Sequence, residues 1–377
     1  MGINTHTADV IIIGGGNIGS AVGYGLVEQG VSVTVIDEGD VALRSARGNF
    51  GLVWFQGKGL GMQRYVEWCL EATQNWPDFA EELEDKTGLT INYQKPGGLD
   101  LCRGEAGLEE RKQELDDLRQ QAGDRKYDCD LIDRKELKSI IPRMKLGPNI
   151  LGATFSPHDG HVNSLFLLRA MHTAIKLAGG RYFPGNAVID IRHDGPVFTV
   201  QTQQDRFSAP KLVLAAGLGI PPLAGMLGMK IPVRPERGQI LVTERLLPVL
   251  SYPLSGVRQT AEGSLLFGAS NEPVGYNTTV TTGVIQYIAR RAVEAFPCLS
   301  NVRIVRSWGA LRPLTPDEFP IYLESETYPG AFVLTSHSGV SLTSLYATRI
   351  PRWIMSGERP YGFDAFDVRR FHVSKNA

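Results

Sequence analysis

The chain has 377 residues and a formal net charge of −1, and 42% of its residues are hydrophobic against 21% that are charged. That length suits two domains, and the near-zero charge gives no electrostatic basis for binding nucleic acid or an anionic membrane. Because no uninterrupted run of about 18 apolar residues occurs, we expect no transmembrane segment.

A glycine-rich turn directly follows the first apolar stretch. Residues 10–13 (Val-Ile-Ile-Ile) are typical of a buried strand, and Gly14, Gly16 and Gly19 then have the G-x-G-x-x-G spacing of a dinucleotide-binding turn. The first glycine allows a tight turn, the second lets the backbone approach a pyrophosphate, and the third lets the next helix pack closely. The N-terminal amides of that helix then face the phosphates.

The residues after this turn complete the same unit. We expect a helix over residues 20–29, ended by Gly30, and a second strand over residues 31–36 that leads to Asp37. Asp37 lies 37 − 19 = 18 residues after Gly19, about where an acidic side chain contacts a ribose hydroxyl. A glycine-rich turn without a ligand is the alternative. The complete order of strand, turn, helix, strand and acid favours a nucleotide site.

Two further glycine-rich stretches precede a long helical pattern. Residues 44–54, beginning with Arg44, and residues 56–61 combine glycine with basic and aromatic side chains, which indicates backbone close to a ligand. A plain surface loop is the alternative. Residues 62–87 and 107–121 then have the spacing of amphipathic helices, and the residues between them, 89–101, predict strands split by Pro96-Gly97-Gly98.

Helix and strand patterns alternate over the rest of the chain. Asn163 or Ser164 can cap a helix over residues 165–178. Residues 211–217 predict a buried strand that ends in small residues, so a nucleotide can pass near its end. Further strands are expected over residues 187–189, 198–207 (a hairpin), 239–243, 254–259, 264–269 and 332–335, and further helices over residues 280–296 and 341–355.

Nucleotide-type segments therefore occur at the start, middle and end of the chain, with sheet-rich segments between them, which predicts a discontinuous two-domain α/β protein. The four cysteines lie far apart and the seven histidines lack metal-binding spacing, so we expect no metal site. The first apolar stretch has no basic region before it, so we expect no signal peptide and a cytoplasmic location.

Seven short segments follow one another in an order that is specific to one protein family. They are Gly14 to Gly19 with Asp37, Asp159-Gly160, residues 213–217, residues 234–239, Gly268-Ala269-Ser270 with Glu272, residues 309–317 and His337-Ser338-Gly339. In these segments the chain resembles the D-amino-acid oxidase and glycine oxidase family of FAD-dependent amine oxidoreductases, over nearly its whole length. Residues 47–54 and 56–59 look most like the smaller (beta) catalytic subunit of heteromeric opine (octopine and nopaline) oxidases. Hydrogen cyanide synthase and the heteromeric proline or hydroxyproline dehydrogenases are similar as well.

The resemblance implies a fold and its division. An α/β chain of this kind has a Rossmann-like FAD-binding domain of the glutathione-reductase type and a discontinuous antiparallel-sheet substrate domain. The FAD-binding domain would comprise residues 1–85, 145–225 and 301–377, and the substrate domain residues 86–144 and 226–300.

The resemblance also implies FAD. Its pyrophosphate would lie on Gly14 to Gly19, its ribose on Asp37, its adenine near Val188, and its isoalloxazine between residues 49–51 and 337–339. The expected cofactor-binding residues are Gly14, Gly16, Asn17, Ile18, Gly19, Asp37, Glu38, Ser45, Arg47, Asn49, Phe50, Gly51, Leu52, Val188, Ala215, Ala216, Gly217, Gly238, Arg312, Ser338, Gly339, Val340 and Ser341.

Two positions depart from the family pattern. Ala310 stands where monomeric sarcosine oxidases have the cysteine that binds flavin covalently, so we expect non-covalent FAD. Ser341 stands where the family often has glycine, so we expect the last helix to pack differently against the flavin.

Four residues are expected in catalysis. Arg312 is expected to clamp the substrate carboxylate, because a guanidinium forks a carboxylate through two parallel hydrogen bonds; an ion pair with Asp317 or Glu318 is the alternative. Arg258 and Tyr252 would contact a second carboxylate or the amine; the alternative is that they face the surface. His337 would hydrogen-bond the flavin or lie near it as a positive charge; the alternative is a buried histidine with its hydrogen bonds satisfied.

The expected reaction is the FAD-dependent oxidation of a secondary amine such as octopine or nopaline, by hydride transfer to flavin N5. The imine would hydrolyse to a 2-oxo acid and an amino acid, and the electrons would pass to partner subunits. The resemblance implies a larger alpha subunit and leaves open a small iron–sulfur subunit and an FMN at or in the partners; Lys58 is a candidate for holding such a second phosphate-bearing cofactor at a subunit interface.

Three other interpretations stay open. The same fold serves an oxidase or dehydrogenase of glycine, sarcosine, D-proline or D-hydroxyproline. A different class of protein, a flavin-bearing electron-transfer or assembly subunit, would have no substrate of its own. An NAD-dependent dehydrogenase is disfavoured, because residues 213–217 and the C-terminal His-Ser-Gly segment have no natural place in it.

Overall fold

The computed structural model describes residues 4–39 and 45–371. Arg44 and the two ends of the predicted FAD-binding domain, residues 1–3 and 372–377, lie outside the described residues. Within the described ranges, no helix combines the length and the apolar character that crossing a membrane requires.

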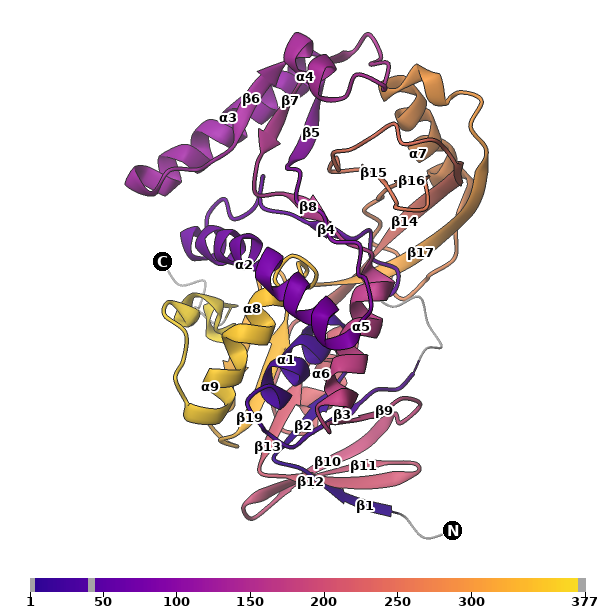
Figure 1. Cartoon of the computed structure of the whole chain (residues 1–377). Helices are drawn as coiled ribbons and strands as arrows, with labels where there is room; N and C mark the ends of the chain where they lie inside the picture. Colours follow the sequence, from indigo (N-terminus) through magenta and orange to yellow (C-terminus); the bar gives the residue numbers. More distant parts are fainter. Residues whose placement is uncertain (1–3, 40–44, 372–377) are drawn as a thin grey trace.

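A six-stranded sheet forms the centre of the nucleotide-binding half (Figure 1). Its strand order is β18-β19-β13-β2-β3-β9, and every neighbouring pair is parallel except β18 with β19. Parallel strands covered on both faces are apolar along nearly their whole length; β2 is entirely apolar, and β3 is apolar apart from the buried Thr34. The strands are β2 (Val10–Ile13), β3 (Val33–Ile36), β9 (Arg181–Phe183), β13 (Lys211–Leu214), β18 (Ile321–Glu324) and β19 (Ala331–Thr335).

The two faces of this sheet have different covers. Val10 and Ile12 pack into a hydrophobic cluster with helices α1, α2, α5 and α8, whereas Ile11 and Ile13 pack against α6 and a small four-stranded sheet. Alternate residues of one strand thus anchor both layers. The covering elements are α1 (Asn17–Val27), α2 (Gln63–Thr87), α5 (Ser164–Leu177), α6 (Ile220–Gly225), α8 (Thr343–Thr348), β1 (Asn4–Thr7), β10 (Val188–Asp194), β11 (Val197–Thr202) and β12 (Asp205–Ala209).

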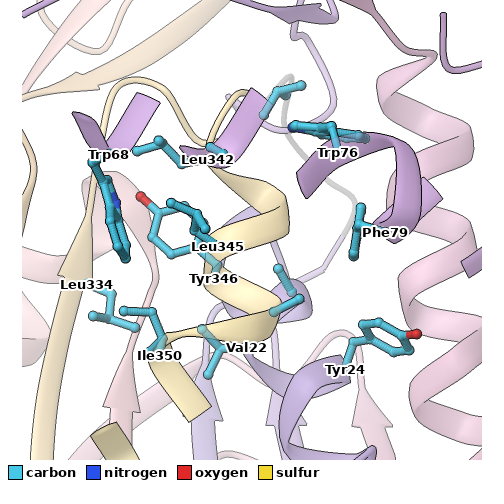
Figure 2. Packing of buried hydrophobic residues seen from close by; sticks show 14 of the residues in the cluster. Val22, Tyr24, Trp68, Trp76, Phe79, Leu334, Leu342, Leu345, Tyr346 and Ile350 are labelled. Carbon is cyan, nitrogen blue, oxygen red and sulfur yellow. The ribbon is translucent and has the colours of Figure 1, made fainter. Parts of the chain in front are cut away.

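The contact between α1 and α8 is close because of a glycine. A Cβ added at Gly25 would lie 1.8 Å from the backbone oxygen of Ala347. Around this contact, one hydrophobic cluster contains Val22 of α1, Trp68 of α2, Tyr346 of α8 and Ile350, two residues after α8 (Figure 2). Helix α5 begins where the sequence predicts, because the Asn163 side chain accepts hydrogen bonds from the amides of Leu165 and Phe166.

The other half contains two antiparallel sheets and three helices (Figure 1). Their inner faces share one hydrophobic cluster. One sheet has the order β15-β16-β14-β17 and the other β5-β7-β6, and a two-stranded ribbon, β4-β8, lies between the two halves. The elements are β4 (Leu52–Val53), β5 (Gly98–Arg103), α3 (Gly104–Ala122), β6 (Asp130–Asp133), α4 (Arg134–Ile140), β7 (Ile150–Ser156), β8 (Gly160–His161), β14 (Arg234–Arg245), β15 (Val257–Gln259), β16 (Ser264–Phe267), α7 (Thr282–Ala295) and β17 (Ile304–Leu314).

Two predicted elements differ in the structure. The expected final helix over residues 341–355 is two short helices, α8 and α9 (Ile350–Ser356), because Pro351 lacks the amide hydrogen that a continuous helix needs and disfavours the α conformation before it. No strand precedes Pro96 in residues 89–95; that segment makes a single β-bridge from Gln94 to His161.

The predicted domain boundaries assign β7 and β17 to the FAD-binding domain, but both strands pair within the sheets of the other half. The division into an FAD-binding and a substrate domain stays a prediction.

Candidate active site

A cavity of about 700 Å³ opens at the carboxyl ends of β2, β3 and β13, where the chain turns away from the sheet. Open α/β sheets bind ligands at this edge. Ligand pockets span roughly 300–1,000 Å³, so this cavity has the size of a ligand site. Its predicted lining residues are Gly14, Gly16, Asn17, Ile18, Asp37, Glu38, Ser45, Arg47, Asn49, Val188, Ala215, Ala216, Gly217, His337 and Gly339.

The glycines of the first turn have the separate roles that their spacing predicts. A Cβ on Gly14, whose φ is +109°, would lie 2.5 Å from the backbone oxygen of Ala215, and a Cβ on Gly19 would lie 1.9 Å from that of Gly14. Among the described residues, a Cβ on Gly16 would approach only Ala46, at 3.7 Å. Gly14 and Gly19 are therefore required by the fold, whereas Gly16 keeps the space beside the cavity open.

The N-terminus of α1 lies at the cavity and has no side-chain cap from the described residues. Its N-cap residue is Gly16, and its first turn has no acidic residue. Asn17 lines the cavity, and its buried Oδ1 has no hydrogen-bond partner. An uncapped helix N-terminus beside a cavity favours an anion, because its amides and the helix dipole present positive charge. This end of the cavity therefore fits a pyrophosphate.

Asp37 lies at the end of β3, as the spacing predicts. Its carboxylate accepts hydrogen bonds from the amides of Gly15 (2.7 Å) and Gly39 (2.8 Å), and it lines the cavity. A carboxylate has about four acceptor positions, so Asp37 retains capacity for a ribose hydroxyl while it holds the turn.

His172 supports the same turn, and sequence reasoning missed it. Its Nε2 lies 2.9 Å from both Gly15 O and Ser20 Oγ, and its ring stacks on Tyr182 with centroids 4.1 Å apart. A single histidine on an amphipathic helix gives no sequence signal for this contact.

A second cavity, of about 260 Å³, adjoins the first and shares Ser45, Asn49 and His337 with it. The predicted site residues that line it are Ser45, Asn49, Phe50, Leu52, Gly238, Arg312, His337, Ser338, Val340 and Ser341. Segments distant in sequence thus meet here. Gly19, Gly51, Arg258 and Tyr252 line neither cavity.

Arg312 lies on β17 opposite Glu236 of β14. Its guanidinium lies 3.5 Å from the Glu236 carboxylate, donates to Asn271 Oδ1 (2.6 Å) and donates to the backbone oxygen of Ser270. Asp317 forms its ion pair with Arg370 instead, at 2.7 Å. Asp317 is therefore excluded as the ion-pair partner of Arg312. Arg312 lines the cavity, where a ligand carboxylate can replace the polar groups that contact its guanidinium.

His337 lines both cavities, but it is not a positive charge. Burial, together with the nearby charges of Lys58 and Arg312, lowers the pKa of His337 to about 3. The imidazole is therefore neutral at physiological pH, and the predicted role as a nearby cation is wrong. A neutral imidazole still offers one donor and one acceptor.

Arg258 and Tyr252 do not reach the cavity as expected. The Arg258 guanidinium is buried and donates through Nε to the backbone oxygen of Phe50, so it holds the loop that borders the cavity. Tyr252 packs edge-on against Phe155, with ring centroids 6.2 Å apart, in the cluster between the antiparallel sheets. Sequence spacing alone does not show whether such residues line the cavity or lie outside it.

Lys58 points into the second cavity, where its Nζ donates to Ser338 Oγ (2.8 Å) and Ser341 Oγ (3.1 Å). The role of Lys58 in holding a phosphate-bearing cofactor at a subunit interface stays a prediction. Ser341, the departure from the family pattern, is thus an acceptor for Lys58, and it also accepts from the amide of Trp54 at 3.0 Å.

A buried polar network holds the loop that carries Lys58. Asp159, fully buried, accepts hydrogen bonds from the amide of Phe55 (2.5 Å) and from Gln56 Nε2 (2.6 Å). Gln56 in turn donates to Gly98 O (3.0 Å) and accepts from Thr154 Oγ1 (2.6 Å). Burial raises the pKa of Asp159 to about 7, although these donors act in the opposite direction. The Asp159-Gly160 motif was the available signal, and its role is to anchor the loop.

The first cavity, with the helix N-terminus and Asp37 at its edge, fits a dinucleotide, and comparison with known proteins identifies the class. A model of the FAD dependent oxidoreductase family matches residues 9–348. The chain therefore belongs to this family and is an FAD-dependent oxidoreductase acting on amino acids or amines. The family, the fold class and the cofactor that the sequence predicts are confirmed.

Particular relatives cover nearly the whole chain. It is 34% identical to an opine oxidase subunit of Agrobacterium tumefaciens (strain Ach5) over 370 residues, which cover 98% of this chain and 99% of that protein. It is 26% identical to glycine oxidase of Geobacillus kaustophilus (strain HTA426) over 392 residues, covering 98% and 99%. The crystal structure of glycine oxidase from Geobacillus kaustophilus matches the fold with a TM-score of 0.87 at 24% identity, covering 99% of this chain and 100% of that chain.

Replacing Gly16 by Ala tests the pyrophosphate site. A Cβ at this position meets no atom of the described residues closer than 3.7 Å, so we expect the FAD-free protein to keep its melting temperature. FAD affinity should fall at least about tenfold, because the backbone can no longer approach the phosphates. Fluorescence titration of FAD measures the affinity. The matched control is Gly19→Ala, which should lower both. Unchanged FAD affinity in Gly16→Ala would contradict this site.

The low pKa of His337 gives a pH prediction. Because its folded-state pKa is about 3, His337 stays neutral from about pH 5 to pH 9, and kcat/KM with an amine substrate should show no step from it in this range. His337→Asn is expected to change the level of the pH profile but not its apparent pKa values. An inflection present in the parent protein and absent from this variant would show that His337 titrates.

Proposed function

We propose that the protein oxidises the C–N bond of a secondary amine of the N-(carboxyalkyl)amino acid type, such as octopine or nopaline. The observation that carries this proposal is Arg312, a guanidinium on β17 that lines the small cavity next to the dinucleotide cleft. The similarity to the opine oxidase subunit, at 34% identity over nearly the whole length of both chains, supports the choice of substrate class.

The residues of the second cavity bind and orient the substrate. Arg312 would take the carboxylate in a bidentate contact, which fixes the direction of the Cα–H bond as well as the position of the substrate. FAD supplies the acceptor for the hydride that leaves Cα. The apolar walls, including Trp54, Leu52 and Ile240, exclude water while the amine becomes an imine.

The second cavity suits an unprotonated amine, because none of its described lining residues is acidic. His337 is neutral, and no Asp or Glu is among the described residues that line the second cavity. The amine nitrogen can therefore keep its lone pair available for C=N formation. Water then hydrolyses the released imine to a 2-oxo acid and an amino acid.

A second candidate keeps the fold and changes the substrate. The similarity to glycine oxidase, at 26% identity, supports a small amine such as glycine or sarcosine, and D-proline and D-hydroxyproline belong to the same group. A flavin-bearing electron-transfer or assembly subunit without its own substrate is disfavoured, because Arg312 is held in a shaped cavity.

We propose that the electrons leave through partner subunits. The opine oxidase relative is named as one subunit of an assembly, which supports a larger alpha subunit here. Cys69, Cys102 and Cys129 are buried and Cys298 is exposed, and the described residues contain no group of three or more side chains suited to a metal. An iron–sulfur subunit, an FMN at or in the partners and a cytoplasmic location stay predictions.

Changing Arg312 tests the substrate site. Arg312→Ala should lower kcat/KM for octopine or nopaline at least about 100-fold, because a desolvated carboxylate loses its charged, bidentate partner, while FAD content stays near that of the parent. Arg312→Lys should recover part of the loss, since a lysine keeps the charge but not the fork. Equal turnover by all three proteins, with an artificial electron acceptor, would remove Arg312 from the reaction.

The partner requirement has its own test. The purified chain is expected to reduce its flavin with substrate but to turn over slowly with oxygen, because electrons normally pass to another subunit. Oxygen-consumption rates, compared with rates in the presence of an artificial acceptor, measure this. Rapid turnover of an opine with oxygen alone would show that no partner is needed.

A further inference from the structure

The second cavity is lined by two basic side chains, Lys58 and Arg312, and none of its described lining residues is Asp or Glu. His337 adds no charge, because its pKa is lowered to about 3. Glu236 lies 3.5 Å from Arg312, but it is not among the lining residues. Buried charges require compensation. Glu236 compensates Arg312 in part from outside the cavity, and inside the cavity both cations face a space without a described carboxylate, so the arrangement favours a ligand that brings an anionic group to each.

Lys58 retains hydrogen-bonding capacity for a ligand. An ammonium group has three donors, and Nζ donates to two neutral hydroxyls, those of Ser338 (2.8 Å) and Ser341 (3.1 Å). In the part of the chain that the structure describes, no carboxylate forms an ion pair with it. The pKa of Lys58 is lowered, because burial outweighs the opposing effects of the nearby Cys69 and Asp159 side chains. An anionic ligand group would stabilise its charged form.

The loop that carries Lys58 is held from both sides. A Cβ on Gly59, whose φ is +89°, would lie 2.4 Å from Cγ2 of Val66, so the chain packs tightly onto α2. The Gln121 side chain donates to Gly59 O (2.8 Å) and accepts from the amide of Gly61 (2.7 Å). The Asp159–Gln56 network fixes the preceding residues. The Lys58 backbone is therefore positioned before substrate arrives, which reduces the cost of ordering it.

We propose that Lys58, with the hydroxyls of Ser338 and Ser341, binds the second carboxylate of a secondary amine that carries two, while Arg312 binds the first. The inference rests on the proposed function, in which Arg312 takes one carboxylate. It makes Lys58 the residue that selects N-(carboxyalkyl)amino acids over amines with a single carboxylate. It also replaces Arg258 in that role, because the Arg258 guanidinium is buried against Phe50 and lines neither cavity.

Two ether acids test this assignment without turnover. Diglycolate has two carboxylates joined through an ether oxygen, and methoxyacetate has one; neither carries an amine to oxidise. Both are titrated into the FAD-loaded protein, and the shift in flavin absorbance reports binding. In Lys58→Gln, the Kd of diglycolate should rise about 10- to 100-fold, the loss expected for a hydrogen-bonded charge, whereas that of methoxyacetate should change no more than about twofold.

Three further variants isolate the charge. Lys58→Arg should restore most of the preference for diglycolate, and Lys58→Met serves as a second neutral variant if Lys58→Gln does not retain FAD. Lys95→Gln is the matched control. Lys95 is a partly buried lysine whose Nζ donates to Thr73 O (3.0 Å) and which lines neither cavity, so its loss should leave both Kd values unchanged.

The inference is overturned if the FAD-loaded neutral variants weaken binding of both acids equally or of neither. Reduction of the flavin by octopine together with an unaltered diglycolate preference in Lys58→Gln would reject the role of Lys58 and leave the proposed function standing. A preference for diglycolate that depends on Lys58, in a protein whose flavin no secondary amine reduces, would reject the proposed function instead.

Discussion

The close approach of two backbone segments at Gly14 is the constraint on which the rest of the site depends. The turn after β2 has room for no side chain there, because a Cβ would lie 2.5 Å from the Ala215 oxygen at the end of β13. This contact places the uncapped N-terminus of α1 beside the cleft. Asp37 accepts from the amide of Gly15, and Nε2 of His172 lies within hydrogen-bond distance of Gly15 O, so the same turn is held from two further elements. The turn at the nucleotide site is thus held by the protein's own contacts.

The substrate side of the site is built from residues that the sheets bring together. β17 carries Arg312, the turn after β19 carries His337 and Ser338, and the loop after β4 carries Lys58. The buried Asp159 connects this loop to the turn before β8. The charged groups are therefore placed by hydrogen bonds and packing around a small cavity of about 260 Å³. This is the environment in which a carboxylate contact is strongest.

The sequence was sufficient for the nucleotide half and insufficient for the pocket wall. The strand over residues 10–13, the glycine turn and Asp37 follow from local patterns, so their positions agree with the structure. Pro351 lies within an apolar pattern of helical periodicity. That pattern led to the prediction of one continuous helix over residues 341–355, although the proline breaks it. Arg258 lies in a strand and Tyr252 precedes it. The sequence alone does not show which side chains of this sheet face the cavity. Lys58 meets Ser338 and Ser341, 280 and 283 residues away, through a fold that spacing does not encode.

The central claim is that this chain holds FAD beside a site for a secondary amine with carboxylate groups. Its most direct test is the visible spectrum of the purified protein, recorded without oxygen before and after adding octopine, nopaline, sarcosine and D-proline separately. The account predicts a flavin spectrum that octopine or nopaline bleaches and that sarcosine and D-proline bleach far more slowly. A colourless protein would contradict the cofactor site, and bleaching by sarcosine or D-proline alone would contradict the proposed substrate class.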